Sequence, residues 1–170
     1  MNRPEKSEYG EYYDRYISQV ADEKVEDLLA QQPGKLRELF AAVGEDRGTF
    51  AYDQGKWTLK EVLSHLIDGE RIFAYRMLRI SRGDETPIEG FEQDGYIENS
   101  NANNRTFAEL LDEFDLQRRA NMLLINNLSD EASKRLGTAS GFPVSVRALV
   151  YISAGHVQHH AAILKERYAI

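Results

Sequence analysis

The sequence predicts an all-α protein, a four-helix bundle with a long crossover loop between its second and third helices. Two observations predict this fold class. Four stretches of the chain carry apolar residues at helical spacing, and two of them open with a capping box. Few segments alternate polar and apolar residues as a strand would. The clearest of them, residues 49–52, is too short and isolated to indicate a sheet.

Length and composition indicate one globular domain. A chain of 170 residues can bury well over half of the surface that it exposes when unfolded, and no linker rich in Pro, Gly or Ser divides it. We therefore expect a single domain over residues 1–170. No apolar run approaches the roughly 18 residues that span a bilayer. The first residues lack the features of a secretory signal, so we expect a cytoplasmic protein with no membrane partner.

Charge and cysteine content exclude several classes of function. The formal net charge of −7, with 21 basic residues scattered among 28 acidic ones, repels phosphate backbones and excludes nucleic acid as an expected partner. The sequence has no cysteine, which excludes disulfides, thiolate metal ligands and a cysteine nucleophile. Any metal ion must therefore be bound by imidazole or oxygen, and any thiol that takes part must come from a cosubstrate.

The first helical stretch covers residues 12–43. Pro33 and Gly34 interrupt its apolar pattern, so we expect a short leading helix followed by a longer helix that begins at Pro33. Four tyrosines lie in the N-terminal segment: Tyr9, Tyr12, Tyr13 and Tyr16. They could form a binding face or a dimer contact, but the expectation we prefer is an amphipathic helix that lies on the bundle.

The second helix is expected to begin after Trp57. Thr58 and Glu61 fit a capping box, in which the hydroxyl and the carboxylate satisfy two free amides reciprocally. The helix should continue to about Arg82 and stop at Gly83, because a glycine just past a helix favours its termination.

The third and fourth helices flank the remaining turn signals. Residues 84–105 form a polar segment with several glycines and asparagines, which we interpret as the crossover loop. Such a loop is often functional, but a bundle also needs long connections for topology alone, and both interpretations stay open. Thr106 and Glu109 form a second capping box for a helix to about residue 128. The last helix is expected over residues 145–168.

Three of the four histidines lie in the last helix, at His156, His159 and His160. On a helix that turns about 100° per residue, His156 and His160 border or enter the apolar stripe, whereas His159 falls about 60° away on the other side of His156. The i, i+4 spacing places two imidazoles one above the other, so that both can bind a single ion. We predict His156 and His160 as metal ligands and His159 as a rim residue.

His65 is the remaining histidine, and it flanks the apolar face of the second helix. Gly69 lies one turn further along and leaves room beside it. If the second and fourth helices are neighbours, His65 can supply a third ligand to the same ion. Three neutral imidazoles leave coordination positions open, which is typical of catalytic rather than structural sites. The alternative is that these histidines are hydrogen-bonded core residues, and the spacing alone does not decide between the two.

Weaker candidates surround His65. Asp68 or Glu70 could orient a ligand or act as a base, but a solvated helix face or an intrahelical ion pair with Arg71 is the interpretation we prefer. Trp57 and Tyr52 could line a pocket, and core packing explains them equally well. The sequence has no phosphate-binding glycine loop and no serine nucleophile motif, so it identifies no catalytic side chain.

Several motifs together resemble the DinB-like (YfiT-like) superfamily. They are residues 57–76 (WTLKEVLSHLIDGERIFAYR), 82–84 (RGD), 90–94 (GFEQD) and 155–160 (GHVQHH). The resemblance covers residues 12–168. It implies an up-down-down-up bundle, a divalent ion such as zinc or nickel bound by His65, His156 and His160, and a homodimer. Relatives include transferases and isomerases that use bacillithiol, mycothiol or glutathione, so the resemblance indicates the site better than the reaction.

Two classes of function follow from these expectations. The first is an enzyme that activates a low-molecular-weight thiol at the ion and transfers it to a small-molecule electrophile, with hydrolysis by metal-bound water as the alternative in the same class. The second is a non-enzymatic, stress-associated metal-binding protein, in which the ion ties the second and fourth helices together. A coordination position that opens onto a pocket favours the enzyme.

Overall fold

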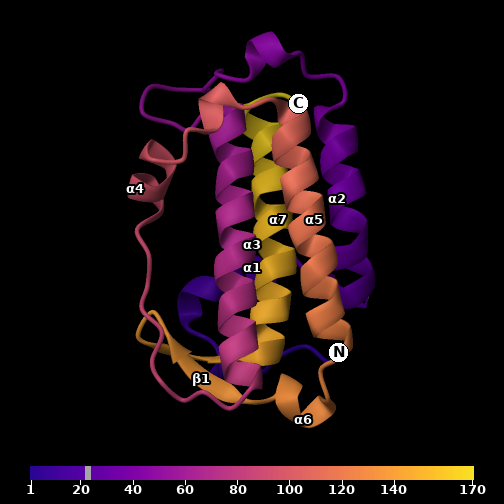
Figure 1. The fold of residues 1–170 in the computed structure, drawn as a ribbon, viewed down its shortest axis with the longest axis vertical. Helices are drawn as coiled ribbons and strands as arrows, with labels where there is room; N and C mark the ends of the chain where they lie inside the picture. Colours follow the sequence, from indigo (N-terminus) through magenta and orange to yellow (C-terminus); the bar gives the residue numbers. More distant parts are fainter. Residues whose placement is uncertain (22–23) are drawn as a thin grey trace.

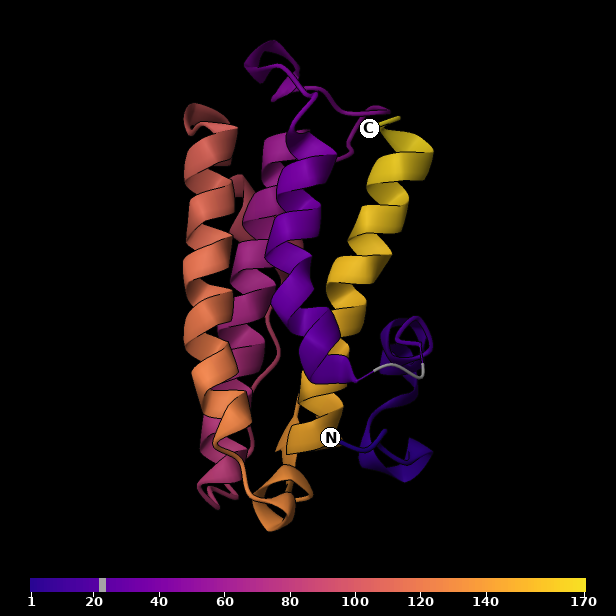
Figure 2. The ribbon, with the colours of Figure 1, turned by 90° about the vertical axis from the view of Figure 1, so that its right-hand side faces the viewer.

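Four long helices make up the body of the protein in the computed structural model, which describes residues 1–21 and 24–170. They are α2 (Val25–Phe40), α3 (Leu59–Ser81), α5 (Phe107–Asn126) and α7 (Val146–Arg167). Figure 1 shows them side by side, and Figure 2 shows the same bundle turned by a quarter. The chain runs up α2, down α3, down α5 and up α7, so the predicted up-down-down-up bundle is confirmed.

The long helices begin and end near the predicted residues because their caps are local. Thr58 and Thr106 each accept a hydrogen bond from the amide three residues on, and Glu61 and Glu109 complete the two capping boxes. Ser145 caps α7 in the same way, through the amide of residue 148. Past the end of α3 the chain takes the left-handed conformation that glycine adopts at no steric cost, at residue 83 with φ of 80°.

The prediction that a helix begins at Pro33 is wrong. Helix α2 runs through Pro33 without a break. Proline has no N–H, so the Leu29 carbonyl one turn earlier loses its helical partner. Arg118 on α5 donates to that carbonyl at 3.2 Å and replaces the missing bond. The helix is therefore continuous because a side chain from another helix satisfies the oxygen that proline leaves free.

A β-hairpin at the lower end of the bundle was not predicted. Strands β1 (Leu136–Ala139) and β2 (Phe142–Ser145) pair antiparallel, with Leu136 opposite Ser145. Ser140 and Gly141 join them, and both have positive φ, 53° and 81°, as a tight two-residue hairpin turn requires. The alternating segment 49–52, in contrast, forms no strand.

Short elements connect the main helices. They are α1 (Asp14–Ile17), α4 (Gln93–Glu98), α6 (Asp130–Ser133) and the 3₁₀ turns Lys6–Glu8, Glu11–Tyr13, Glu45–Arg47 and Ala102–Asn104. The predicted crossover loop rises along the outside of the bundle and carries α4 (Figure 1). Because this loop returns the chain to the end of the bundle where α3 begins, α3 and α5 are parallel. None of the described helices is long and apolar enough to cross a membrane.

The N-terminal segment packs beside α7 (Figure 2), as expected for its tyrosines, but it does so as two 3₁₀ turns and the four-residue α1 and not as one amphipathic helix. Tyr9 and Tyr16 are buried, whereas Tyr12 is 52% exposed. Gly155 allows the close approach, because a Cβ atom there would collide with the Tyr16 backbone carbonyl. The segment thus brings aromatic side chains next to the histidines of α7.

A buried polar layer separates two apolar clusters in the core. It takes one residue from each of the four helices: Gln32, Glu70, Arg118 and Ser153. On α2, α3 and α5 this residue falls between the lower and the upper cluster, and on α7 it falls near the upper end of the lower cluster. Arg118 donates to both Glu70 oxygens, at 2.7 and 2.8 Å, and to Gln32 at 2.6 Å. Ser153 donates to Glu70 at 3.0 Å. Because each polar group has partners, the layer fixes the register of the four helices.

Candidate metal centre

The three predicted ligands converge between α3 and α7. His65 is on α3, and His156 and His160 are one turn apart on α7. One ligand atom from each ring lies within 4.8 Å of the others, and His65 Nε2 is 2.9 Å from His156 Nε2. The side chains are 4%, 4% and 8% exposed. The predicted second and fourth helices, α3 and α7, are therefore neighbours, as a third ligand from His65 requires.

Local sequence sets the orientation of these rings. Side chains four residues apart share a helix face, so the α7 pair points at α3. Gly69, one turn after His65, is needed for this packing because a Cβ atom there would lie 2.9 Å from His156 Cε1. Trp57 packs on the His65 ring, with centroids 4.7 Å apart. Tyr16 and Phe73 meet the His156 ring edge-on, at 5.3 and 5.5 Å.

Burial keeps the three rings uncharged at neutral pH. Desolvation lowers the pKa of His65 to about 4, and it lowers the pKa values of His156 and His160 well below the ordinary 6.5. Neutral imidazole is the form that binds a metal ion. In the described ranges, neither ring nitrogen of His160 has a hydrogen-bond partner. A cation between the three rings would give one nitrogen of each ring a common partner.

The donor set fits a divalent ion. Three imidazoles suit zinc and nickel, whereas calcium and magnesium prefer oxygen ligands. The cluster that the described residues offer contains no carboxylate, so three neutral rings would leave the charge of the ion uncompensated.

His159 lies outside the cluster, as its angular position predicts. Its Nδ1 is 3.3 Å from the Gln19 side-chain nitrogen near the surface, and its ring meets Tyr16 edge-on. The ring is half-buried and meets the His160 ring edge-on at 5.2 Å, but it is not one of the three rings whose nitrogens cluster.

Of the weaker candidates, Glu70 differs most from its expected role. Asp68 and Arg71 form the expected ion pair within α3, at 3.7 Å. Glu70 is neither solvated nor paired within its helix. It is 3% exposed, and although burial opposes its charge, the Arg118 guanidinium holds the pKa of Glu70 below its usual range. A charged residue among the apolar positions of α5, Arg118, was the signal in the sequence that could have revealed this partner.

A cavity of about 590 Å³ opens beside the histidines. His65 and His156 reach it, and its walls are mainly aromatic: Tyr12, Tyr13, Tyr16, Phe73, Phe91 and Phe142. Phe91 comes from the crossover loop and Phe142 from the hairpin, so both connections contribute to the site. Tyr52 is elsewhere, packed edge-on against Tyr168. A pocket of this size and lining is typical of sites for small organic molecules.

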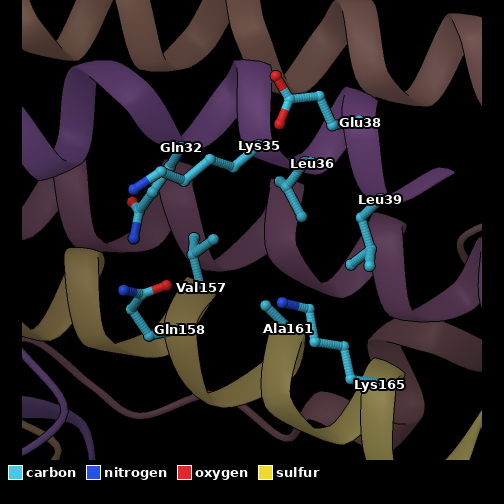
Figure 3. Close-up of a pocket in the computed structure, with 9 residues that line it drawn as sticks. All are labelled: Gln32, Lys35, Leu36, Glu38, Leu39, Val157, Gln158, Ala161 and Lys165. Carbon is cyan, nitrogen blue, oxygen red and sulfur yellow. The ribbon is translucent and has the colours of Figure 1, made fainter. Parts of the chain in front are cut away.

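A second groove, of about 270 Å³, lies between α2 and α7 (Figure 3). Lys35 and Lys165 approach it from the two helices, and Leu36 and Val157 form its apolar floor. None of the clustered histidines lines it. The aromatic cavity, in contrast, joins the candidate metal centre through His65 and His156.

The burial of the histidines predicts a pH dependence of stability without metal. Between about pH 6.5 and pH 4 the unfolded chain binds protons that the folded rings do not, so the free energy of unfolding should fall as the pH falls, by up to about 1.4 kcal/mol per pH unit for each ring. Urea unfolding in chelator at several pH values measures this slope. His65→Gln should make it shallower, and a flat profile between pH 6.5 and 4 would contradict the assigned burial.

Comparison with known proteins places this geometry in a family. A model of the DinB superfamily matches residues 28–164. The solved structure of YfiT from Bacillus subtilis, described as a probable metal-dependent hydrolase with an unusual four-helix bundle topology, is similar with a TM-score of 0.78 and 19% identity, over 99% of this chain and 92% of YfiT. No curated protein sequence gives a significant match.

A second solved structure with the same fold is a mycothiol-dependent maleylpyruvate isomerase. Its TM-score is 0.68 and its identity 15%, over 86% of this chain. The alignment spans only 61% of the isomerase, so a large part of that enzyme has no counterpart here. At these identities both likenesses show the fold alone.

Proposed function

The chain belongs to the DinB superfamily, and from that premise we propose that it is an enzyme in which His65, His156 and His160 bind one divalent ion and a small thiol is transferred to an electrophile. One observation carries this proposal: two of the three clustered histidines open onto an aromatic cavity. A metal that only tied helices together would be enclosed by protein on all sides. When bound, the ion supplies Lewis-acid chemistry that favours the thiolate form of a thiol at neutral pH.

The side chains around the ion have distinct tasks. The three imidazoles would hold the ion without neutralising its charge, so that its Lewis acidity is kept. The aromatic walls bind the apolar body of the electrophile and exclude water. Tyr16 contributes as a neutral hydroxyl, because burial raises its pKa above the ordinary value of 10.0. No base is assigned. The thiol would release its proton to solvent, and the thiolate sulfur would then form a bond to the carbon of the electrophile as the bond to the leaving group breaks.

The test is an assay with a chlorinated aromatic electrophile. Protein loaded with zinc or nickel is combined with dinitrochlorobenzene and with bacillithiol, mycothiol or glutathione. We expect chloride release and thioether formation only when both ion and thiol are present, with chelator lowering the rate by about 100-fold or more. His156→Ala should lose the activity, and His159→Ala should keep it.

The other outcomes separate the alternatives. Turnover of an ester or amide without thiol would reject transfer and favour hydrolysis, the activity proposed for YfiT. Stoichiometric metal binding with no turnover in any arm would favour the non-enzymatic metal-binding protein.

Three further properties stay predictions. The choice of zinc or nickel and the homodimer follow from the family resemblance, and the cytoplasmic location follows from the lack of a secretory signal. Imidazole donors suit both ions, so metal analysis of untreated protein must identify the native one. Of the tyrosines considered for a dimer contact, Tyr9 and Tyr16 are buried within the chain, and Tyr12 is the most exposed of the four.

A further inference from the structure

A deeply buried arginine beside the aromatic cavity has no acidic partner. Arg76 on α3 is 2% exposed, and over residues 1–21 and 24–170 no carboxylate pairs with its guanidinium. It donates to three neutral oxygens: the Tyr13 hydroxyl at 3.3 Å, the Ser140 hydroxyl at 2.9 Å and the Glu89 backbone carbonyl at 3.2 Å. Its Nε has no hydrogen-bond partner. A buried charge in this state is costly unless an anion joins it.

Another buried arginine shows how the same fold treats a purely structural cation. Arg118 is 1% exposed, and both oxygens of the Glu70 carboxylate accept hydrogen bonds from it. Arg76 links three segments, the N-terminal turn, the crossover loop and the hairpin, yet none of them provides an acid to it. A structural role in holding these three segments together explains the hydrogen bonds of Arg76. It does not explain why its buried charge has no counter-ion among them.

The two hydroxyl groups that Arg76 contacts are free to donate into the cavity. Tyr13 and Ser140 both line it, together with His65 and His156. Each hydroxyl oxygen accepts from Arg76, so its own proton needs another acceptor, and no described residue supplies one. A cation behind a hydroxyl also strengthens it as a donor. Two such donors at one end of an apolar cavity are suited to an anion.

We propose that Tyr13, Ser140 and Arg76 form a carboxylate-binding subsite, so that the molecule presented to the histidines is an organic acid with an aromatic or unsaturated body. Tyr13 and Ser140 contact the carboxylate, and Arg76 acts as a positioning residue that supplies the charge. The inference rests on the proposed function for the role of the histidines, but anion binding itself does not need the metal.

The spacing of His65 and Arg76 along α3 leaves room for the body of such an acid. Arg76 is eleven residues after His65 on nearly the same face of α3, about 16 Å along the helix axis. Helical side chains lean toward the N-terminus, so the Arg76 side chain leans toward the histidines and shortens this span. Glu92, the acid among the cavity residues, is exposed, and its carboxylate accepts from the Asp94 amide at the start of α4. Its charge is therefore exposed to solvent, which screens it.

The test compares an acid with its neutral amide. Binding of phenylpropionate and of phenylpropionamide is measured by calorimetry, on zinc-loaded and on chelator-treated protein. We expect the acid to bind about tenfold tighter or more in both preparations. Tyr13→Phe and Ser140→Gly should each reduce this preference, and the double variant should abolish it. Glycine suits the positive φ of residue 140, and phenylalanine keeps the ring of residue 13, so we expect both variants to fold.

Tyr12→Phe is the matched control, because Tyr12 lines the same cavity but its hydroxyl faces Tyr16 instead of Arg76. It should keep the full preference for the acid. Phenylethylphosphonate forms a further arm that distinguishes a carboxylate site from a phosphate site. Equal affinity for acid and amide, or a preference that survives the double variant, would overturn the proposal.

The outcomes separate this subsite from the metal centre. A preference for the acid that appears only with zinc and is unchanged in the double variant would mean that the ion binds the acid, which overturns the subsite and leaves the proposed function intact. A zinc-independent preference that depends on Tyr13 and Ser140, in a protein that binds no ion, would support the subsite and reject the proposed function.

Discussion

Replacing Arg118 with methionine should lower the free energy of unfolding by about 3–5 kcal/mol. The guanidinium is fully buried, and its loss leaves the Glu70 carboxylate without its counter-ion in the core. The same change also frees the Leu29 carbonyl beside Pro33 and the Gln32 side-chain oxygen. Each unpaired buried polar group adds to the cost. Equilibrium unfolding in urea, monitored by circular dichroism, measures the difference.

Two companion variants make this prediction specific. Arg119→Met removes the same charge from the exposed neighbouring position and should change stability by less than about 0.5 kcal/mol. The double variant Glu70→Leu with Arg118→Met removes both charges and should recover much of the loss, because an apolar pair does not suffer the isolated-charge penalty. A loss below about 1 kcal/mol in Arg118→Met would mean that the polar layer does not hold the four helices together.

Alanine at His65, His156 or His160 should reduce metal binding from about one ion per chain to almost none. Each change removes one of three nitrogens, and two imidazoles alone cannot hold the ion against solvent, so we expect affinity to fall by more than about 100-fold. Equilibrium dialysis against zinc or nickel, followed by metal analysis, gives the stoichiometry. Zinc should also raise the melting temperature of the unmodified protein and leave that of the three variants unchanged.

His159→Ala is the internal control for these variants. The residue is adjacent to His160 in sequence, but its ring bonds to Gln19 outside the cluster. It should keep its full metal content. Equal loss from His159→Ala and His160→Ala would show that the orientation of α7 is wrong.

Local signals made most of the fold predictable. The capping boxes at Thr58 and Thr106 fixed where α3 and α5 begin, since a cap depends on residues three positions apart. The continuity of α2 through Pro33 was not predictable in this way, because its compensation comes from Arg118, a residue distant in the sequence. The hairpin was missed because each of its strands has only four residues and the signal lies in the Ser140–Gly141 turn.

Local sequence signals also predicted the histidines of the candidate site, but they did not predict its cavity. The spacing of His156 and His160 on one face indicated two ligands. The position of His65 beside the apolar face of the second helix indicated the third, and the family resemblance implied the same three residues. The cavity was not predictable, because Phe91, Phe142 and Tyr13 come from three separate segments whose meeting depends on tertiary structure. Arg118 is a charged residue among the apolar positions of α5, which indicated a buried partner. No local pattern distinguished Arg76 from a surface residue.

X-ray absorption spectroscopy on protein loaded with one equivalent of zinc tests the metal centre most directly. The proposed site predicts three imidazole nitrogens at about 2.0–2.1 Å from the ion, and a remaining position filled by solvent or by an added thiol. With thiol present, one sulfur at about 2.3 Å should appear. A spectrum with carboxylate ligands in place of imidazoles, or one unchanged by His156→Ala, would contradict the site formed by His65, His156 and His160.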